Sequence, residues 1–399
     1  MNEAAFLRRA YSIGALRELA RQTLPRVLFD MVDGGAGDEI TLRRNEAALA
    51  ELFFVPKVLN GAPERIQTVE LLGHRLTSPL IVGPTGLAGL LWPKAEIATA
   101  RAAARFGTIY TTSHASTSTI EEIGSAGGGP KWMQVFLYKD RSLTAEFADR
   151  AKQAGYQGLV LTVDNQVMAG RDRDTRNGMA FPLRMTARNG FDLISHPRWL
   201  MRMAGGPVPT FVNYGRHASV GAFGKLMKEQ LDPAVSWDDL QWLRDRWQGH
   251  LLIKGLLDAG EAREAQRRGA DAIIVSNHGG RQLDGAIASI EALPAIVEAV
   301  GKQLPVLVDG GFRRGTDVVK ALALGARAVL IGRPHLWGVA CRGEAGVHRV
   351  LEIFRTEIDR ALALGGWNGV AKLDGALVPA ASARRHTNWH TGPTNRTSE

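Results

Sequence analysis

The sequence has almost no cysteine and no long uncharged stretch that could form a helix. Cys341 is the only cysteine among 399 residues, which excludes an internal disulfide framework and fits a reducing compartment. The longest uncharged run, Leu76–Pro93, contains three prolines and several glycines, so it cannot form a membrane-spanning helix. The first residues carry acidic side chains and read as a helix, unlike a secretory signal. These absences exclude an integral membrane protein.

Neither sign of charge is scarce, but basic residues outnumber acidic ones. The chain has 49 Lys and Arg against 40 Asp and Glu, a formal net charge of +9. Hydrophobic residues make up 45% and charged residues 22%, as in soluble globular proteins with a sizeable core. An evenly spread excess of positive charge would only favour solubility, whereas a concentrated one would indicate an anionic partner.

Eight short runs rich in Val, Ile and Leu alternate with amphipathic helical stretches. They are Leu80–Gly86, Thr108–Ser113, Trp132–Leu137, Gly158–Asp164, Leu251–Gly255, Ala272–His278, Pro305–Gly311 and Ala328–Pro334. This alternation predicts an α/β fold, a (β/α)8 TIM barrel, rather than an open sheet. We predict one domain spanning residues 1–399, with an N-terminal helical layer in residues 1–65 and a mobile polar tail in residues 380–399.

One connection, after the fourth predicted strand, is several times longer than the usual βα loop. Within this insertion, residues 176–235, the stretch Met179–Lys228 holds seven Arg and Lys against one acid, Asp192. Large apolar residues interleave with these charges: Phe191, Leu193, Ile194, Trp199, Leu200, Met201 and Met203. A solvated loop over the active site would explain the pattern, and so would the headgroup boundary of an anionic membrane. Nucleic acid could use the same charges, but no nucleic-acid motif accompanies them. We predict membrane contact.

The stretch Ser276–Gly285, with the sequence SNHGGRQLDG, places a histidine at the end of the sixth predicted strand and an arginine just after it. A TIM barrel keeps its chemistry at the carboxyl ends of its strands. His278 is therefore a candidate base, and Asp164, at the end of the fourth strand, is short enough to orient the imidazole and stabilise its protonated form. Arg281 and Arg171 are candidates for binding a carboxylate.

The loops after the last two strands carry glycine amides together with Arg313, Arg314 and Arg333. Because this is the usual phosphate site of the fold, we favour it over two ordinary glycine turns with surface arginines. Lys254 lies on a core strand, where lysine is rarely buried without a partner. It indicates a Schiff base or a fixed positive charge beside an electron-accepting ring, and the pattern alone does not separate the two.

These motifs resemble those of the FMN-dependent 2-hydroxy acid dehydrogenases and oxidases. SNHGGRQLDG matches the family signature, and GPTGLAGLLWPK, LTVD, IKG, DGGFRRGTDVVKALALGA and IGRP also match. The chain is most similar to the membrane-associated (S)-mandelate and L-lactate dehydrogenase branch, whose membrane-binding insertion falls at the same place. The resemblance implies FMN, a respiratory quinone as acceptor, peripheral attachment to the cytoplasmic face of the cell membrane, and a homotetramer. We predict no metal site.

The resemblance also assigns roles residue by residue. His278 would be the catalytic base, paired with Asp164, while Arg281 and Arg171 would hold the substrate carboxylate and the developing charge. Lys254 would lie near the flavin N1 and O2, which favours flavin electrostatics over a Schiff base. Flavin contacts would come from Pro84, Thr85, Gly86, Ser113, Gln134, Thr162 and Ser276. The phosphate and ribityl chain would contact Asp309, Gly311, Arg313, Gly332 and Arg333.

Two positions depart from the family pattern. Met31 and Phe136 stand where the family has tyrosines whose hydroxyls help to bind the substrate. Losing a hydrogen bond to a charged group costs roughly 1.5–3 kcal/mol. The changes fit drift in an enzyme that relies on its arginines, or a different substrate, such as a larger hydroxy acid or a group on a peptide. Ala115 stands where some relatives have tryptophan, which suggests more room.

Three alternatives to the quinone-linked dehydrogenase therefore stay open. Dioxygen would replace the quinone as the electron acceptor in an oxidase. A flavin-binding barrel without this chemistry would serve as a binding or assembly component, although the intact His278, Asp164, Arg281 and Lys254 argue against it. A peptide-modifying oxidase would use the same barrel on a larger substrate.

Overall fold

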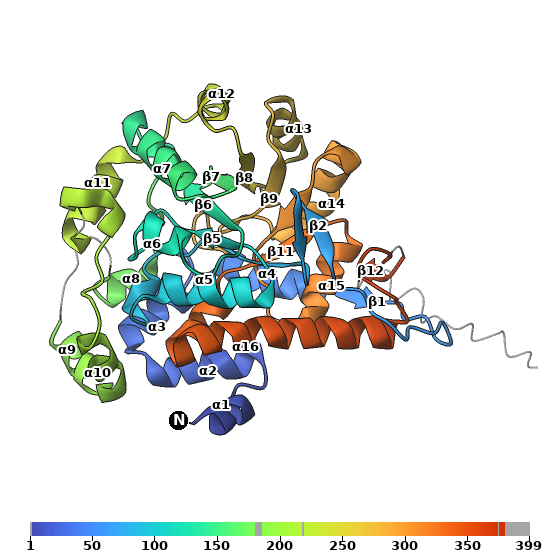
Figure 1. The fold of residues 1–399 in the computed structure, drawn as a ribbon, viewed down its shortest axis with the longest axis horizontal. Coiled ribbons are helices and arrows are strands. Elements are labelled where there is room, and N and C mark those ends of the chain that lie inside the picture. The colour runs from blue at the N-terminus through green and yellow to red at the C-terminus, as the bar shows by residue number, and fades with distance from the viewer. Residues whose placement is uncertain (1, 180–185, 218, 374, 380–399) are drawn as a thin grey trace, which may run out of the picture.

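The computed structural model describes residues 2–179, 186–217, 219–373 and 375–379, and at its centre lies a closed barrel of parallel strands (Figure 1). Neighbouring strands pair in the order β10-β11-β4-β5-β6-β7-β8-β9, so each strand lies beside the next along the chain and the last pairs with the first. The eight strands are β4 (Leu80–Val82), β5 (Tyr110–Thr112), β6 (Lys131–Val135), β7 (Gly158–Thr162), β8 (His250–Leu256), β9 (Ala272–Val275), β10 (Val306–Val308) and β11 (Ala328–Ile331). The predicted (β/α)8 barrel is confirmed.

The strands are almost entirely buried, as a parallel sheet covered by helices requires. Most of them end earlier than the sequence pattern predicts. The first ends at Val82 instead of Gly86, and the sixth at Val275 instead of His278. His278 has a φ of 58°, which no strand accommodates. The polar residues that follow each strand therefore lie in loops at one rim of the barrel.

One helix or helical segment follows each strand and covers the barrel. These helices are α5 (Ala95–Phe106), α6 (Ile120–Gly124), α7 (Arg141–Gln153), α12 (Trp237–Arg246), α13 (Ala259–Arg267), α14 (Ser289–Val300), α15 (Gly315–Ala323) and α16 (Arg333–Gly365), with 3-10 turns η1 (Ala88–Leu90) and η3 (Gly301–Gln303). The sequence predicts a final helix near 346–365, but α16 begins at Arg333 because a kink at Arg342 and Gly343 joins two helical parts.

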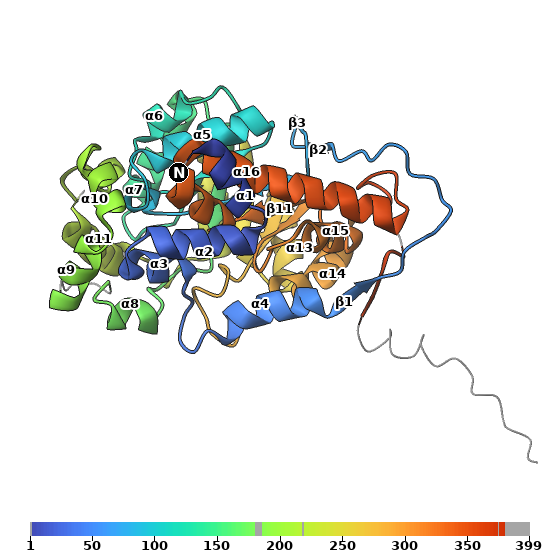
Figure 2. The same ribbon diagram turned by 90° about the horizontal axis from the view of Figure 1, so that it is seen from below.

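Four helices precede the barrel: α1 (Glu3–Arg9), α2 (Ile13–Thr23), α3 (Arg26–Asp33) and α4 (Ile40–Ala50). Helix α2 packs against α16, and α3 ends at Gly34, as predicted, beside the carboxyl rim (Figure 2). Small antiparallel pairs complete this region: β1 (Leu52–Phe54) with β12 (Leu377–Pro379), and β2 (Val69–Leu71) with β3 (His74–Leu76).

The connection between β7 and α12 forms a helical lobe at one edge of the molecule, on the left in both views (Figures 1 and 2). It holds α8 (Asp172–Arg176), α9 (Ala187–Ile194), α10 (Pro197–Ala204), η2 (Val212–His217) and α11 (Val220–Gln230). Arg184 of the basic segment and the predicted mobile tail at 380–399 lie outside the described residues. No described helix is long and apolar enough to cross a membrane.

Candidate active site

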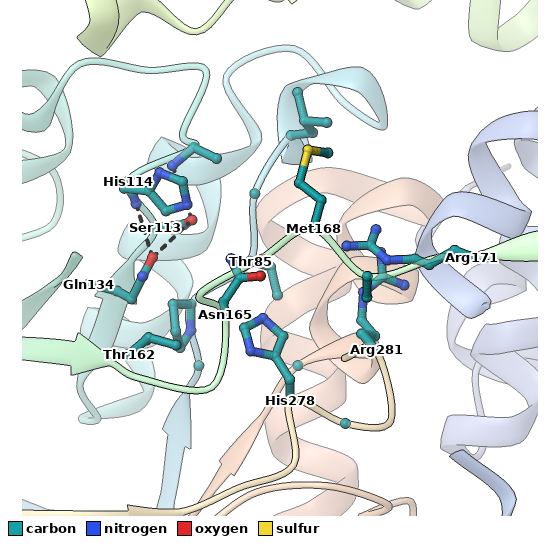
Figure 3. A pocket seen from close by; sticks show the side chains of 18 of the residues that line it. Thr85, Ser113, His114, Gln134, Thr162, Asn165, Met168, Arg171, His278 and Arg281 are labelled. Carbon is teal, nitrogen blue, oxygen red and sulfur yellow. Dashed lines mark hydrogen bonds between the residues drawn. The ribbon is translucent and has the colours of Figure 1, made fainter. Parts of the chain in front are cut away.

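A cavity of about 840 Å³ opens at the carboxyl ends of the strands. Seventeen of the nineteen residues named through the family resemblance line it, from Met31 in the N-terminal layer to Arg333 at the start of α16. The two that do not are Asp164 and Ser276, which lie behind the lining. Figure 3 shows His278 in this cavity, with Arg171 and Arg281 to one side of it and His114, Ser113 and Gln134 to the other.

His278 reaches the cavity because its backbone adopts a left-handed conformation, followed by Gly279 and Gly280 with φ of 64° and 72°. A Cβ on Gly280 would lie 2.5 Å from the Leu42 nitrogen, so only glycine fits where the loop crosses α4. Reciprocal hydrogen bonds of 2.9 and 2.8 Å between the Asn45 and Asn277 amides hold the loop on that helix. The N-terminal layer thus fixes where the imidazole points.

Asp164 and His278 form the pair that the sequence predicts. His278 Nδ1 lies 2.8 Å from Asp164 Oδ1. Burial alone would raise the pKa of the Asp164 carboxyl, but the charge and hydrogen bond of His278, together with Lys254, hold that pKa below its usual value. Asp164 is therefore a carboxylate that accepts a hydrogen bond from Nδ1–H, which leaves Nε2 of His278 as the free ring nitrogen.

Arg281 and Arg171 face the same cavity and repel each other. Arg281 is enclosed by protein, and burial, with the charges of Arg171 and Arg333, holds its pKa well below the usual value. Its Nη1 donates to the Gly34 carbonyl at 2.8 Å, and Arg171 Nη1 lies 3.3 Å from Asp174 Oδ2. Nε of Arg171 is buried and without a partner among the described residues. An anion bound between the two guanidinium groups would relieve this repulsion.

Lys254 is buried on β8 and remains paired. Its Nζ lies 3.2 Å from Asp309 Oδ2 and donates to Ser276 Oγ at 2.9 Å. Burial would lower the pKa of Lys254, but Asp309 and Asp164 raise it above its usual value. A Schiff base needs a neutral amine, so this environment favours a fixed positive charge. Ser276 does not line the cavity; its hydroxyl instead binds Lys254 and the His278 amide.

The wall formed by β5, β6 and β7 offers buried polar atoms without partners in the described structure. Two such atoms are Gln134 Nε2 and Thr162 Oγ1, and both residues line the cavity. Buried polar groups are normally hydrogen-bonded, so these atoms indicate a polar ligand beside them. A flavin ring fits here, since its ring nitrogens and carbonyls would pair with Gln134, Thr162 and the charged Lys254. Pro84, Thr85 and Gly86 line the same cavity, as a flat ring would require.

The predicted phosphate end lies in the same cavity, where Gly311, Gly332, Arg313 and Arg333 line it. Arg333 donates to the carbonyls of Val32, Gly279 and Gly34, and thereby ties α16 to both the N-terminal layer and the His278 loop. Arg313 contacts Glu46 at 2.9 Å and lies over Trp337. Arg314 instead pairs with Glu357 at 3.2 Å and does not line the cavity.

Met31 and Phe136, the two departures from the family pattern, both line the cavity and are nearly buried. They put apolar surface at positions where hydroxyls were expected.

The sequence interpretation missed several residues of the site. His335 on α16 places its Nε2 3.0 Å from Thr85 Oγ1, while its Nδ1 lies 3.2 Å from the Ile331 carbonyl, so it orients Thr85 from behind. His114 and Asn165 line the cavity, and each directly follows a residue that the sequence predicts at a strand end, Ser113 and Asp164. That adjacency was the available signal. Phe211, Phe223 and Met227 come from the insertion, and no local pattern places them here.

Comparison with known proteins agrees with this site. The (S)-mandelate dehydrogenase of Pseudomonas putida is 41% identical over 365 residues, 91% of this chain and 92% of that protein. An L-lactate dehydrogenase of Xanthomonas campestris pv. campestris is 41% identical, covering 90% and 94%. An L-lactate oxidase of Nostoc sp. is 42% identical, covering 90% and 96%.

Solved structures of the same kinds of enzyme are also similar to this chain. The crystal structure of the monotopic membrane protein (S)-mandelate dehydrogenase matches with a TM-score of 0.89 at 40% identity, over 92% of this chain and 99% of that one. A mandelate oxidase matches with a TM-score of 0.78 at 36% identity, over 90% and 96%. The sequence model of the FMN-dependent dehydrogenases covers residues 20–380. From its barrel, its site and these matches, the chain belongs to the FMN-dependent dehydrogenase family.

Proposed function

We propose that the protein oxidises an L-2-hydroxy acid to the 2-oxo acid, with His278 as the base and a membrane quinone as the final electron acceptor. The observation that carries this proposal is the arrangement of His278 in the cavity. Its Nδ1 is bound by Asp164 at 2.8 Å, and Arg171 and Arg281 line the cavity beside it (Figure 3). A base and two cations in one cavity suit a substrate with a hydroxyl and a carboxylate.

The substrate loses two electrons and two protons when its hydroxyl carbon becomes a carbonyl. FMN, when bound, would accept the two electrons and one of the two protons. Nε2 of His278 takes one proton, and Asp164 stabilises the resulting imidazolium. Arg281 and Arg171 hold the carboxylate, which fixes the hydroxyl carbon near the imidazole. Lys254, kept positive by Asp309, would stabilise negative charge gained by the flavin ring beside Gln134 and Thr162.

The helical lobe after β7 supports a membrane quinone as acceptor. Phe191, Ile194 and Met201 on α9 and α10 are 76%, 71% and 69% exposed, and Val208 just after them is 82% exposed. Exposed apolar side chains on one basic lobe suit insertion among anionic lipid headgroups. A monotopic membrane protein among the related structures also supports this. We infer peripheral attachment at the cytoplasmic face, and the homotetramer expected from the sequence stays a prediction.

Dioxygen is the second candidate acceptor, because an L-lactate oxidase is 42% identical to this chain. The two candidates differ in their product. An oxidase releases hydrogen peroxide during turnover without a quinone, whereas a dehydrogenase turns over only when a quinone or dye is added.

The test is anaerobic reduction of the purified, FMN-loaded protein by hydroxy acids from lactate to mandelate and longer aliphatic acids. We expect the flavin absorbance to bleach with at least one L-acid and not with its D-enantiomer. In His278→Ala, which keeps the arginines, the rate should fall about 10²- to 10⁴-fold. Admitting air then separates the acceptors by peroxide release. A flavin that no hydroxy acid reduces would contradict the proposed function.

A further inference from the structure

A buried polar cluster beside Phe136 takes no part in the proposed reaction. It consists of His114 after β5, Tyr138 after β6, and Tyr214 in η2 of the insertion, and all three are buried. His114 Nδ1 lies 2.5 Å from the Tyr214 hydroxyl and 3.0 Å from the Tyr138 hydroxyl. The two hydroxyl oxygens are 2.6 Å apart. The insertion therefore closes this cluster, because it supplies Tyr214.

The three contacts fix the tautomer of His114. If Nδ1 carries no proton, one tyrosine donates to the other and the second donates to Nδ1, so both hydroxyl protons are satisfied. If Nδ1 carries a proton, it donates to one hydroxyl oxygen, and that tyrosine donates to the other hydroxyl oxygen. The proton of the second tyrosine is then buried without an acceptor, because a protonated Nδ1 cannot accept it. Leaving a buried donor unpaired is costly. The satisfied arrangement places the ring proton of His114 on Nε2.

Nε2 of His114 faces the cavity. This atom makes no hydrogen bond within the described residues, and protein does not fully enclose it. The residue lines the cavity, and Figure 3 shows it across from Arg171 and Arg281, with His278 between them. Burial and the nearby His278 lower the pKa of His114 to about 3. A neutral N–H donor therefore stands there at physiological pH.

The surroundings of this donor are aromatic. The His114 ring centroid lies 4.4 Å from that of Phe136 and 6.2 Å from that of Phe223. Phe211 stacks on Phe223 at 3.5 Å, and Met227 lines the same wall. A substrate whose carboxylate lies at the arginines would turn its side chain toward this wall. An apolar side chain fits it, and His114 adds one hydrogen-bond donor.

We propose that His114 is a specificity-determining residue that donates a hydrogen bond from Nε2 to a neutral oxygen on the side chain of the 2-hydroxy acid. The preferred substrate is then an aromatic or long apolar hydroxy acid that carries a hydroxyl or carbonyl oxygen on its side chain. Tyr138 and Tyr214 are positioning residues, because they hold the tautomer. This inference rests on the proposed function and deepens it by naming the substrate class.

The experiment compares (S)-4-hydroxymandelate with (S)-4-methylmandelate, which have similar volume but differ in the oxygen. With the wild-type holoenzyme and a dye acceptor, we expect kcat/KM to favour the hydroxyl compound by about tenfold, since a buried donor left unpaired is penalised. In His114→Phe the preference should vanish or reverse. In Tyr138→Phe/Tyr214→Phe, which frees the tautomer, it should fall to an intermediate value.

A binding measurement separates failure of this inference from failure of the proposed function. Calorimetry with 4-hydroxyphenylacetate and 4-methylphenylacetate reads the same discrimination without turnover, because neither acid has the reacting hydroxyl. We expect about tenfold tighter binding of the hydroxyl compound by wild type alone. Equal binding by wild type, or an unchanged preference in His114→Phe, would overturn the inference. Discrimination in binding without flavin reduction by any hydroxy acid would overturn only the proposed function.

Discussion

At the scale of single residues, the carboxylate of Asp164 decides what His278 is able to do. Its Oδ1 accepts a hydrogen bond from His278 Nδ1 at 2.8 Å, which keeps Nε2 of the imidazole free. Gly255, with a φ of 115°, leaves room for it, because a Cβ there would lie 2.8 Å from the Asp164 side chain. The ends of three strands that are distant in sequence, β7, β8 and β9, thus form the site of this pair.

Asp164→Asn keeps the shape of this pair and removes its charge. We expect kcat for flavin reduction to fall about 10²-fold, because the imidazolium that forms when His278 takes a proton loses its counter-charge. KM should change little, since the substitution leaves Arg171 and Arg281, the proposed carboxylate contacts, in place. Stopped-flow reduction under anaerobic conditions measures the effect. Activity within threefold of wild type would contradict the pairing.

Phe136 offers a gain-of-function test at the same scale. Phe136→Tyr places a hydroxyl on a side chain that lines the cavity, and Phe136→Leu is the control that removes the ring without adding a donor. If the missing hydroxyl limits binding of a substrate oxygen, kcat/KM for mandelate should rise about tenfold in the tyrosine variant alone, as one added hydrogen bond of about 1.4 kcal/mol would produce. An equal or lower value would show that the pocket has been adapted to another substrate.

At the scale of elements, α9 and α10 do not act as one uniform basic and aromatic surface. The sequence places Trp199 among the membrane-facing residues, but it is only 8% exposed and its Nε1 donates to the Leu90 carbonyl at 3.1 Å. Arg202 also turns inward, 4.0 Å from the Trp92 ring centroid. These two side chains attach the lobe to the barrel and leave Phe191, Ile194 and Met201 exposed.

The lobe predicts a specific membrane phenotype. Phe191→Asp/Ile194→Asp should lower the bound fraction at least tenfold in co-sedimentation with phosphatidylglycerol vesicles, since each exposed apolar side chain loses roughly 1.5–3 kcal/mol of burial. Val58→Asp is the matched control, because Val58 is 82% exposed in the loop between β1 and β2, away from the lobe. Turnover with a soluble dye should persist. Equal losses in both variants would rule out a localised membrane contact.

At the scale of the whole molecule, two buried histidines link stability to pH. Burial and His278 lower the pKa of His114 to about 3, and burial lowers that of His335 to about 4. Both folded-state values lie below the unfolded value of about 6.5. The folded protein therefore binds fewer protons between these limits, and this contribution to stability is complete above pH 6.5 and is lost as pH falls toward 4.

Other groups act in the opposite direction, so the test is a difference between variants. Burial raises the pKa of Glu96, for example, which favours the folded state as pH falls. His114→Phe removes one titrating histidine, and its Tm should fall less steeply than that of wild type between pH 6.5 and 4. Within this range, the difference in unfolding free energy between the two proteins should change by about 1.4 kcal/mol per pH unit. Parallel Tm curves would show that His114 is not kept neutral by folding.

The sequence by itself determined the barrel and most of the cavity lining, for a local physical reason. Apolar runs mark buried strands, and the polar residues that follow each run must gather at one rim, since all strands are parallel. His278, Lys254 and Gln134 are placed together by this rule alone, whatever the loops between them do. The pattern did not determine the strand limits, because apolar residues do not mark the point at which a residue such as His278 leaves the extended conformation.

Only the tertiary structure decided contacts between segments that have no periodic relation. Ser276 binds Lys254 behind the lining, Arg333 binds backbone carbonyls, and Trp199 faces inward, all because of partners on other elements of the chain. The cluster of His114 with Tyr138 and Tyr214 is the strongest case. Hydrogen bonds require particular atoms within about 3 Å. Sequence spacing fixes that distance within a helix or strand, but across an insertion of many residues only packing does.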